Sequence, residues 1–398
     1  MNWRDDFAAA MMGSAPSALL KLERGDGCYV WDDEGNQYLD FLAGIAVNAL
    51  GHAHPAFVEA VSSQAATLAH VSNYFATGPQ IELAQRLRRI TGAGEQGRVF
   101  LANSGAEAIE AAVKLARLTG RPRILSLQNS FHGRTIGSLS LTGKAALRSD
   151  FEPLLPGVEH IEATVEALEA AMGADVAALV VEPIQGEAGV VDLPEGYLER
   201  ARALTSEHGA LLILDEIQTG AGRTGSWFAF QRSGIVPDAI TIAKGIGGGF
   251  PIGALVTFGV ASDLFRAGQH GSTFGGNPLA AAVANAVLAE IESAGLVDNA
   301  ARRGQELKAA INGIGSPLVA ELRGRGLLLG VGLTEPVAQR VAAEALSLGL
   351  IVNAANESSV RIAPPLIVGD AEIAEFTEKF TNALTAASTG ATAMEARA

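Results

Sequence analysis

Lys244 is the residue with the clearest chemical potential, because of the segments that flank it. It follows the apolar run Asp238-Ala-Ile-Thr-Ile-Ala and precedes the glycine-rich loop Gly245-Ile-Gly-Gly-Gly-Phe-Pro-Ile-Gly253. A free lysine has a pKa of about 10.4 and usually lies at the surface as a solvated charge. At the end of a strand in an α/β sheet, it would instead face the crevice in which such sheets bind ligands.

A second apolar run, Ala210-Leu-Leu-Ile-Leu214, ends in Asp215-Glu-Ile-Gln218. A lysine that can form a Schiff base and an aspartate that can hold a pyridinium nitrogen suggest pyridoxal phosphate as a cofactor. The alternatives for Asp215 are an ordinary helix or turn start and a metal ligand. The hypothesis therefore depends on a phosphate site, a support for the pyridine ring and arginines for substrate carboxylates.

A strand–turn–helix pattern provides a candidate phosphate site. Arg98-Val-Phe-Leu101 is typical of a strand, and residues 106–118 have apolar residues at helical spacing. Ser104 is the expected N-cap, and Glu107 follows three residues later, as in a capping box. A helix N-terminus attracts phosphate, and Gly105 lets the backbone approach the ligand closely. The alternative is an ordinary capped helix without a ligand.

The ring support and a first arginine follow in the loop Asn129-Ser-Phe-His-Gly-Arg-Thr135, after the strand-like run Arg123-Ile-Leu-Ser-Leu127. Phe131 could stack on a pyridine ring. Arg134 could bind a substrate carboxylate through a forked pair of hydrogen bonds. Taken alone, Phe131 is equally compatible with a core position and Arg134 with an exposed loop charge.

Together with further segments, these motifs resemble the class III pyridoxal-phosphate aminotransferases, in family order along nearly the whole chain. The segments that carry the resemblance are Gly44-Ile-Ala-Val-Asn-Ala-Leu-Gly-His-Ala-His-Pro55, Asn103-Ser-Gly-Ala-Glu-Ala108, Phe131-His-Gly-Arg-Thr135, Val181-Glu-Pro-Ile-Gln-Gly-Glu187, Leu214-Asp-Glu-Ile-Gln-Thr-Gly220, Ala243-Lys-Gly245, His270-Gly-Ser-Thr-Phe-Gly-Gly-Asn-Pro278, Arg323-Gly-Arg-Gly-Leu-Leu-Leu-Gly330 and Arg361-Ile-Ala-Pro-Pro365. The resemblance implies the aspartate-aminotransferase-like (type I) fold, which is α/β. It has a large domain with a mainly parallel seven-stranded sheet and a smaller α+β domain.

The resemblance also implies roles around the cofactor. Lys244 would bind pyridoxal 5'-phosphate covalently and then move a proton between the substrate carbon and the cofactor carbon. Asp215 would keep the pyridine nitrogen protonated, and Gln218 would hydrogen-bond the ring hydroxyl. The phosphate would be bound by Ser104, Gly105, Ala106 and Thr273, the last from the partner subunit. A homodimer with a shared active site is therefore expected.

For the substrates, the resemblance implies two arginines and a glutamate gate. Arg134 would bind the donor's α-carboxylate and later the far carboxylate of 2-oxoglutarate, whose α-carboxylate would bind Arg361. Glu187 would neutralise Arg361 while the donor is bound, although a structural salt bridge is the alternative reading. Ser272 is a further candidate contact of the donor. The expected donor is N2-acetyl-L-ornithine, with ornithine, 4-aminobutyrate and succinyl-diaminopimelate as alternatives that the sequence leaves open.

The elements that position these residues alternate between strands and helices, which predicts a mainly parallel sheet. The strands expected there are residues 99–101, 123–127, 177–181, 211–214, 239–242 and 254–257. Helices are expected at residues 278–294 and 300–314, and later strands at 327–331 and 350–352. The resemblance implies a large domain of residues 56–295, with residues 1–55 and 296–398 forming the small domain.

Composition narrows the class of partners. The chain has 398 residues, of which 48% are hydrophobic, and a net charge of −14. This charge argues against nucleic acid or an anionic membrane as a partner. Cys28 is the only cysteine, so no internal disulfide can form. Residues 7–20 are apolar, but Asp5 and Asp6 offset Arg4, so no secretory leader is expected and a cytoplasmic location is favoured.

Other chemistries are weaker readings of the sequence. Gly220-Ala-Gly-Arg-Thr-Gly225 matches the dinucleotide fingerprint, but Asp-Glu-Ile-Gln-Thr separates it from the preceding strand and no clear helix follows, which argues against a nicotinamide dehydrogenase. His52 and His54 lack nearby cysteine or carboxylate partners, so a turn before Pro55 is favoured and no metal site is expected. A pyridoxal-phosphate-binding regulator would have no need of the substrate arginines.

Overall fold

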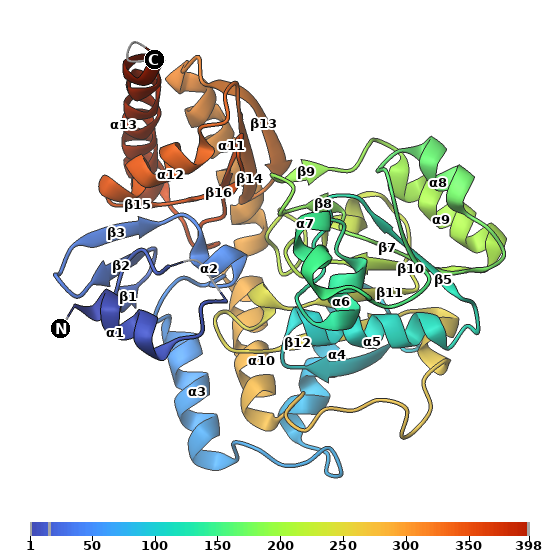
Figure 1. Ribbon diagram of the computed structural model, residues 1–398. Coiled ribbons are helices and arrows are strands. Elements are labelled where there is room, and N and C mark those ends of the chain that lie inside the picture. The colour runs from blue at the N-terminus through green and yellow to red at the C-terminus, as the bar shows by residue number, and fades with distance from the viewer. Residues whose placement is uncertain (1, 15–16, 396–398) are drawn as a thin grey trace.

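The computed structural model describes residues 2–14 and 17–395, which form two parts on either side of helix α10 (Pro278–Ser293) (Figure 1). Green and yellow segments make up most of the part that contains the larger sheet. In the other part, the blue N-terminal strands lie beside the orange and red C-terminal segments (Figure 1). Segments from both ends of the described chain therefore build the smaller part.

The largest sheet among the described residues has seven strands. In spatial order they are β4 (Arg98–Ala102), β12 (Gly253–Thr257), β11 (Ala239–Ile242), β10 (Leu211–Asp215), β7 (Val176–Val181), β5 (Arg123–Leu127) and β6 (Val158–Ile161). Strand β12 runs antiparallel to β4 and β11, and the other neighbouring pairs are parallel. The predicted mainly parallel sheet is confirmed. The sequence analysis missed β6, because this edge strand is short and half of it is polar.

The sheet is buried on both faces, because successive side chains of a strand point to opposite sides. In β10, Leu212 and Leu214 belong to one core cluster, and Leu211 and Ile213 to another. Helix α5 (Gly105–Arg117) covers the second face with its apolar side. This double burial explains why the central strands are almost uninterrupted apolar runs.

The larger part contains further helices. They are α3 (Pro55–Thr67), α4 (Gly78–Thr91), α6 (Ile136–Leu141), α7 (Ala145–Arg148), α8 (Val165–Ala171) and α9 (Tyr197–His208), with the short hairpin β8 (Ile184–Gln185) and β9 (Val191–Asp192) beside them. Helix α10 packs against α3 and α4. The helices predicted at residues 106–118 and 278–294 correspond to α5 and α10.

The smaller part contains two four-stranded sheets. One has the order β1 (Leu22–Asp26), β2 (Tyr29–Asp32), β3 (Gln37–Asp40) and β15 (Leu350–Ile351). The other has the order β13 (Val319–Arg325), β14 (Leu328–Leu333), β17 (Ser359–Ile362) and β16 (Asn353–Asn356). Strand β3 pairs in parallel with β15, and this pairing joins N-terminal and C-terminal segments.

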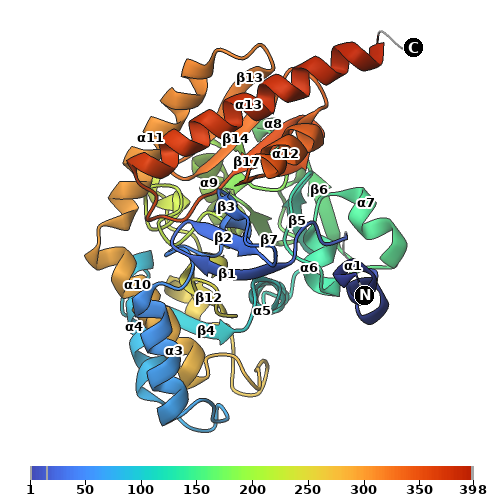
Figure 2. The same cartoon turned by 90° about the vertical axis from the view of Figure 1, so that its left-hand side faces the viewer.

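Helices α11 (Leu296–Ile314), α12 (Ala338–Ser347) and α13 (Asp370–Glu395) belong to this smaller part, and α1 (Trp3–Ala10) lies near its N-terminal strands. Figure 2 shows α11, α12 and α13 over β13, β14 and β17. The α/β fold class with a large sheet and a smaller part is thus as expected. The domain limits at residues 55 and 295 remain a prediction.

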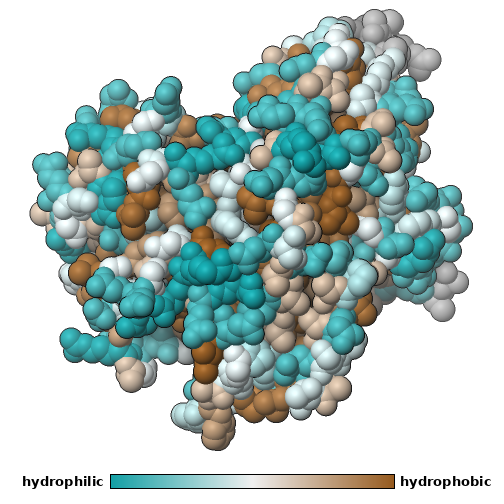
Figure 3. Space-filling model, turned by 180° about the vertical axis from the view of Figure 1, so that it is seen from behind, coloured by the Kyte–Doolittle hydropathy of each residue, from teal (hydrophilic) through white to brown (hydrophobic). Residues whose placement is uncertain are grey.

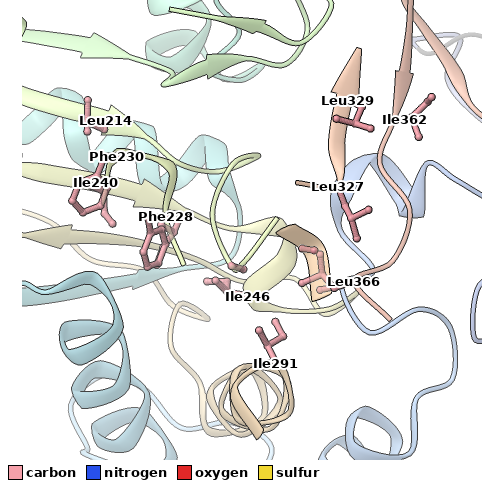
Figure 4. Packing of buried hydrophobic residues seen from close by; sticks show 14 of the residues in the cluster. Leu214, Phe228, Phe230, Ile240, Ile246, Ile291, Leu327, Leu329, Ile362 and Leu366 are labelled. Atoms are coloured by element: carbon pink, nitrogen blue, oxygen red, sulfur yellow. The ribbon is translucent and has the colours of Figure 1, made fainter. Parts of the chain in front are cut away.

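One apolar cluster connects the two parts. It includes Leu214 and Ile240 of the large sheet, Ile291 of α10, and Leu329 and Ile362 of the small sheet. Figure 4 shows these side chains together with Phe228 and Ile246, which come from the segments before and after β11. Because the cluster is continuous, the loops between the two sheets pack on buried apolar side chains.

Crossing a bilayer takes about 20 apolar residues in one helix. No described helix is long and apolar enough by itself. Helices α10 and α11 satisfy length and composition only together, as a pair bent by 63°. Most residues of α10 are buried within the protein.

A left-handed turn lies between β3 and the cavity described below. Ala43, Gly44, Ile45 and Ala46 have φ values of 50°, 65°, 66° and 60°. Each non-glycine residue in the left-handed conformation raises the free energy of the folded chain by about 1–2 kcal/mol. The buried Asp40 carboxylate stabilises the turn by accepting hydrogen bonds from the Leu42 and Ala43 N–H groups, at 3.0 and 2.8 Å. The same carboxylate lies 2.8 Å from His52 Nε2.

We expect Asp40→Ala to lower the free energy of unfolding by about 2–4 kcal/mol, because a buried polar group without its partner costs about 1–3 kcal/mol. Asp40→Asn, which keeps an acceptor for the two N–H groups, should lose less than half as much. Urea denaturation measures both values. An Asp40→Ala variant as stable as the parent chain would contradict this role.

Candidate active site

A cavity of about 420 Å³ lies where the large sheet meets the smaller part. Its wall includes residues that follow β4, β5, β7, β10 and β11, whose carboxyl ends meet at one edge of the sheet. The lining residues are Val47, Asn103, Ser104, Gly105, Ala106, Phe131, His132, Gly133, Arg134, Glu182, Glu187, Asp215, Ile217, Gln218, Ala243, Lys244, Gly249, Phe250, Pro251 and Ile252. Most residues singled out in the sequence are thus brought together.

The N-terminus of α5 forms one end of the cavity. Ser104 is the N-cap, and its hydroxyl accepts a hydrogen bond from the Glu107 N–H at 3.2 Å. Glu107 does not complete the predicted capping box at Ser104: its carboxylate accepts instead from the Asn103 N–H, at 2.6 Å. The first N–H groups of a helix have no partner within the helix and suit an anion. A Cβ at Gly105 would lie 2.8 Å from Ile217 Cδ1, so only glycine fits there.

Asp215 lies at the end of β10 and is buried. Its carboxylate accepts hydrogen bonds from the Ile217 N–H at 3.0 Å and from the Thr241 hydroxyl at 3.3 Å. His132 Nδ1 lies 2.7 Å from its other oxygen. Burial alone would lower the pKa of His132, but the hydrogen bond and charge of Asp215 outweigh this and raise it.

His132 was not assigned a role in the sequence analysis. Its ring is fully buried, and its Nε2 has no hydrogen-bond partner among the described residues. The one sequence signal that could have marked His132 is its position between Phe131 and Arg134, in a loop that follows a strand. That signal cannot identify Asp215 as its partner, because the two residues are 83 positions apart.

Two buried glutamates were also missed. Glu182 accepts hydrogen bonds from the Phe131 N–H at 2.9 Å and the Gly186 N–H at 3.4 Å, and so connects the loops after β5 and β7. Glu216 accepts from the Ala229 and Phe230 N–H groups, at 3.1 and 2.8 Å. Burial raises the pKa of each carboxyl to about 7.

Lys244 follows β11 with a φ of 47°, a left-handed conformation that is uncommon outside glycine. Its side chain lines the cavity. Burial lowers the pKa of Lys244 to about 8, and the positive charge of Arg361 acts in the same direction. An amine with a pKa near neutrality is suited to accepting and returning a proton.

Arg361, on β17, is 1% exposed and forms an ion pair with Glu187, whose side chain is 25% exposed. The guanidinium also donates to Gln218 Oε1 at 3.2 Å and to Asn353 Oδ1 at 3.1 Å. Burial alone would raise the pKa of Glu187, but the charge and hydrogen bond of Arg361 hold it below its usual value. Glu187 and Gln218 line the cavity and Arg361 does not, so the pair joins the larger part to the smaller part at the cavity wall.

Phe131 and Arg134 both line the cavity. Phe131 is half-buried and Arg134 is exposed, with its guanidinium carbon 5.7 Å from the centre of the Phe131 ring. Arg134 lines the cavity and is exposed, whereas Arg361 is buried beside the lining residue Glu187, so the two guanidinium groups offer carboxylates two separate positions.

Ser272 and Thr273 do not line this cavity. Thr273 is exposed at the surface. The Ser272 hydroxyl accepts hydrogen bonds from Asn103 Nδ2 at 3.2 Å and from the Gly275 N–H at 2.9 Å. Within a single chain, the predicted site residues Ser272 and Thr273 therefore lie outside the cavity.

Comparison with known proteins agrees with this arrangement. A sequence model of the family described as Aminotransferase class-III matches residues 11–384. The acetylornithine aminotransferase of Streptomyces coelicolor is 50% identical over 372 residues, which cover 93% of this chain and 92% of that protein. That of Mycobacterium tuberculosis is 51% identical over 374 residues, with 94% of each chain covered.

Solved structures show the same fold. An ornithine aminotransferase from Toxoplasma gondii superposes with a TM-score of 0.92 at 33% identity, over 98% of this chain and 95% of that one. An N-acetylornithine aminotransferase from Stenotrophomonas maltophilia superposes with a TM-score of 0.82 at 37% identity, over 96% and 98% of the two chains. By sequence, fold and the residues gathered in its cavity, this chain belongs to the class-III aminotransferases.

Proposed function

We propose that this chain transfers the terminal amino group of N2-acetyl-L-ornithine to 2-oxoglutarate, giving N-acetyl-L-glutamate 5-semialdehyde and L-glutamate in arginine biosynthesis. The relatives at about 50% identity over more than nine-tenths of the chain carry the name of this activity. The structural observation that carries the proposal is the ion pair between the buried Arg361 and Glu187, because Glu187 lines one cavity with Lys244 and Asp215.

The cofactor of this family is pyridoxal phosphate, and the cavity fits it. The helix N-terminus at Gly105 suits the phosphate, because the missing side chain leaves backbone N–H groups accessible. Asp215 offers a buried carboxylate to the ring nitrogen, and Phe131 lines the cavity where it can support the ring. Once bound, the cofactor accepts the electron pair left when a proton departs from the substrate carbon.

Lys244 would carry that proton between the substrate carbon and the cofactor carbon, for which its pKa of about 8 is suited. Asp215 would hold a proton on the ring nitrogen. His132 supports this role, because its contact with Asp215 Oδ2 fixes the orientation of the carboxylate. Gln218 would hydrogen-bond the ring hydroxyl.

Glu187 and Arg361 would act as a gate between two chemically different substrates. The reacting end of acetylornithine carries no carboxylate, so Glu187 neutralises Arg361 while this donor is bound. The α-carboxylate of 2-oxoglutarate would then replace Glu187, with its far carboxylate at Arg134. An unpaired buried arginine would cost several kcal/mol, on the order of 3–5, which makes such a replacement necessary.

We further propose a homodimer located in the cytoplasm, in which Thr273 reaches the phosphate site of the partner. The surface around Thr273 supports the homodimer, because large apolar side chains are exposed on it: Tyr74 at 92%, Phe75 at 66% and Phe274 at 59%. The rings of Phe274 and His70 lie 4.9 Å apart, so the two exposed loops are in contact. Brown apolar patches also interrupt the surface in Figure 3.

Steady-state kinetics with several donors tests the function directly. The ratio kcat/KM should be at least about tenfold higher for acetylornithine than for ornithine, 4-aminobutyrate or succinyl-diaminopimelate, a difference of about 1.4 kcal/mol in the barrier. A preference for ornithine would assign the reaction of the Toxoplasma gondii neighbour instead.

Asp215→Asn keeps the shape of the side chain but removes its charge. We expect kcat to fall by at least about 10²-fold, because the ring nitrogen is no longer held protonated. Near-ultraviolet circular dichroism is the control for folding and for bound cofactor. Activity within about threefold of the parent enzyme would show that Asp215 has another role.

The gate is tested by following each half-reaction separately through the cofactor absorbance in single turnovers. Arg361→Ala should slow the 2-oxoglutarate half by about 10²-fold and the donor half much less, since loss of a charged partner costs about 2–5 kcal/mol. Glu187→Ala should do the reverse. Equal damage to both halves in both variants would leave a purely structural ion pair.

A further inference from the structure

Lys144, between α6 and α7, contacts the backbone of Glu187, one of the two residues of the proposed gate. Its ammonium donates a hydrogen bond to the backbone oxygen of Glu187 at 2.5 Å. The side chain is half-buried and does not line the cavity, whereas Glu187 does. A lysine ammonium has three donors. In the part of the chain that the structure describes, the bond to Glu187 is the hydrogen bond this ammonium makes.

Three cations act on the Glu187 carboxylate. Burial raises its pKa, while the charges of Arg361, Lys244 and Lys144 lower it. Arg361 is almost fully buried beside the cavity, whose wall includes its partners Glu187 and Gln218. Lys144 contacts the backbone oxygen of Glu187 and is more exposed to solvent than Arg361.

The backbone around the gate is held at two points. Lys144 binds the Glu187 carbonyl, and the preceding Gly186 N–H donates to Glu182 Oε1 at 3.4 Å. Because the Glu187 carbonyl and the Gly186 N–H are both held, the Glu187 carboxylate changes its position by rotation about the side-chain bonds. A buried carboxylate that loses one cation requires another polar partner, because an unpaired charge in such surroundings is costly.

We propose that Lys144 is a positioning residue that receives the Glu187 carboxylate when 2-oxoglutarate displaces it from Arg361. The gate is then a switch with two positions, Arg361 when closed and Lys144 when open. This inference rests on the proposed gating function of Glu187 and Arg361. It assigns Lys144 no contact with either substrate.

The test uses Lys144→Met, which keeps an unbranched apolar stem and removes charge and donors. We expect the 2-oxoglutarate half-reaction to become about five- to tenfold less efficient, in line with the loss of one partly exposed charged hydrogen bond. The dissociation constant of glutarate, a dicarboxylate without the reactive oxo group, should rise by the same factor in calorimetry. The donor half-reaction should stay within about twofold, and Lys144→Arg should restore both values.

Lys379→Met is the matched control, because the Lys379 ammonium also donates to a backbone oxygen, that of Gly349 at 3.0 Å, away from the cavity lining. It should leave both half-reactions unchanged. In a Glu187→Ala background, Lys144→Met should have no further effect on glutarate binding, because no carboxylate remains to be received.

Three outcomes would overturn the proposal: no change in Lys144→Met, equal damage to both half-reactions, or an effect that persists without Glu187. The last would mean that Lys144 binds the oxo acid itself. Arg361→Ala in the same series separates this failure from failure of the gate. If Arg361→Ala selectively impairs the 2-oxoglutarate half while Lys144→Met does not, the gate stands and the role of Lys144 falls.

Discussion

A buried charge requires a partner, and in this protein that requirement connects the two parts of the chain. Arg361 is supplied by a strand of the smaller part and Glu187 by a loop of the larger part. The guanidinium also donates to Gln218, which follows the strand that carries Asp215. Any relative movement of the two parts would expose or separate these groups. The arrangement of the cavity thus depends on keeping Arg361 paired.

The other buried polar groups extend the same principle into the loops. Glu182 connects the loop of Phe131 to the loop of Glu187, and Glu216 holds the backbone at Ala229 and Phe230. Backbone N–H groups in irregular segments need acceptors once water is excluded. Carboxylates supply these acceptors, so hydrogen bonds hold the loops that carry the site in place, as they hold the strands beneath them. Small-molecule sites of this kind are usually formed before the ligand arrives.

Much of this arrangement could be predicted from the sequence. Apolar runs that end in Asp215 and just before Lys244 identified strand ends, and parallel strands bring such ends to one edge. The pairing of Glu187 with Arg361 was expected from the family resemblance alone, and contacts between distant residues to which the resemblance assigned no role, such as His132 with Asp215, could not be predicted. Short-range patterns contain no information on which buried groups meet. The edge strand β6 was missed for a related reason, because only its neighbour β5 makes its polar pattern compatible with a sheet.

Local geometry also limited what the sequence could predict. Ser104 caps α5 as expected, but the Glu107 carboxylate binds the N–H of Asn103, one residue before the cap. That choice depends on the turn conformation at Asn103. Ser272 and Thr273 belong to an exposed loop, so their relation to the cavity is not decided within one chain. The left-handed residues at 43–46 have no distinctive sequence signal apart from Gly44.

The parallel pairing of β3 with β15 has a consequence for how the enzyme is made. A ribosome releases the chain from its N-terminus, and domains tend to fold as units while synthesis continues. The seven strands of the large sheet have all emerged once residue 257 is available, but β3 must wait for Leu350 before it gains this neighbour. Arg361 emerges later still. A nascent chain therefore has all seven strands of its large sheet well before it acquires the neighbour of β3 and the buried arginine, so the C-terminal segments complete the smaller part last.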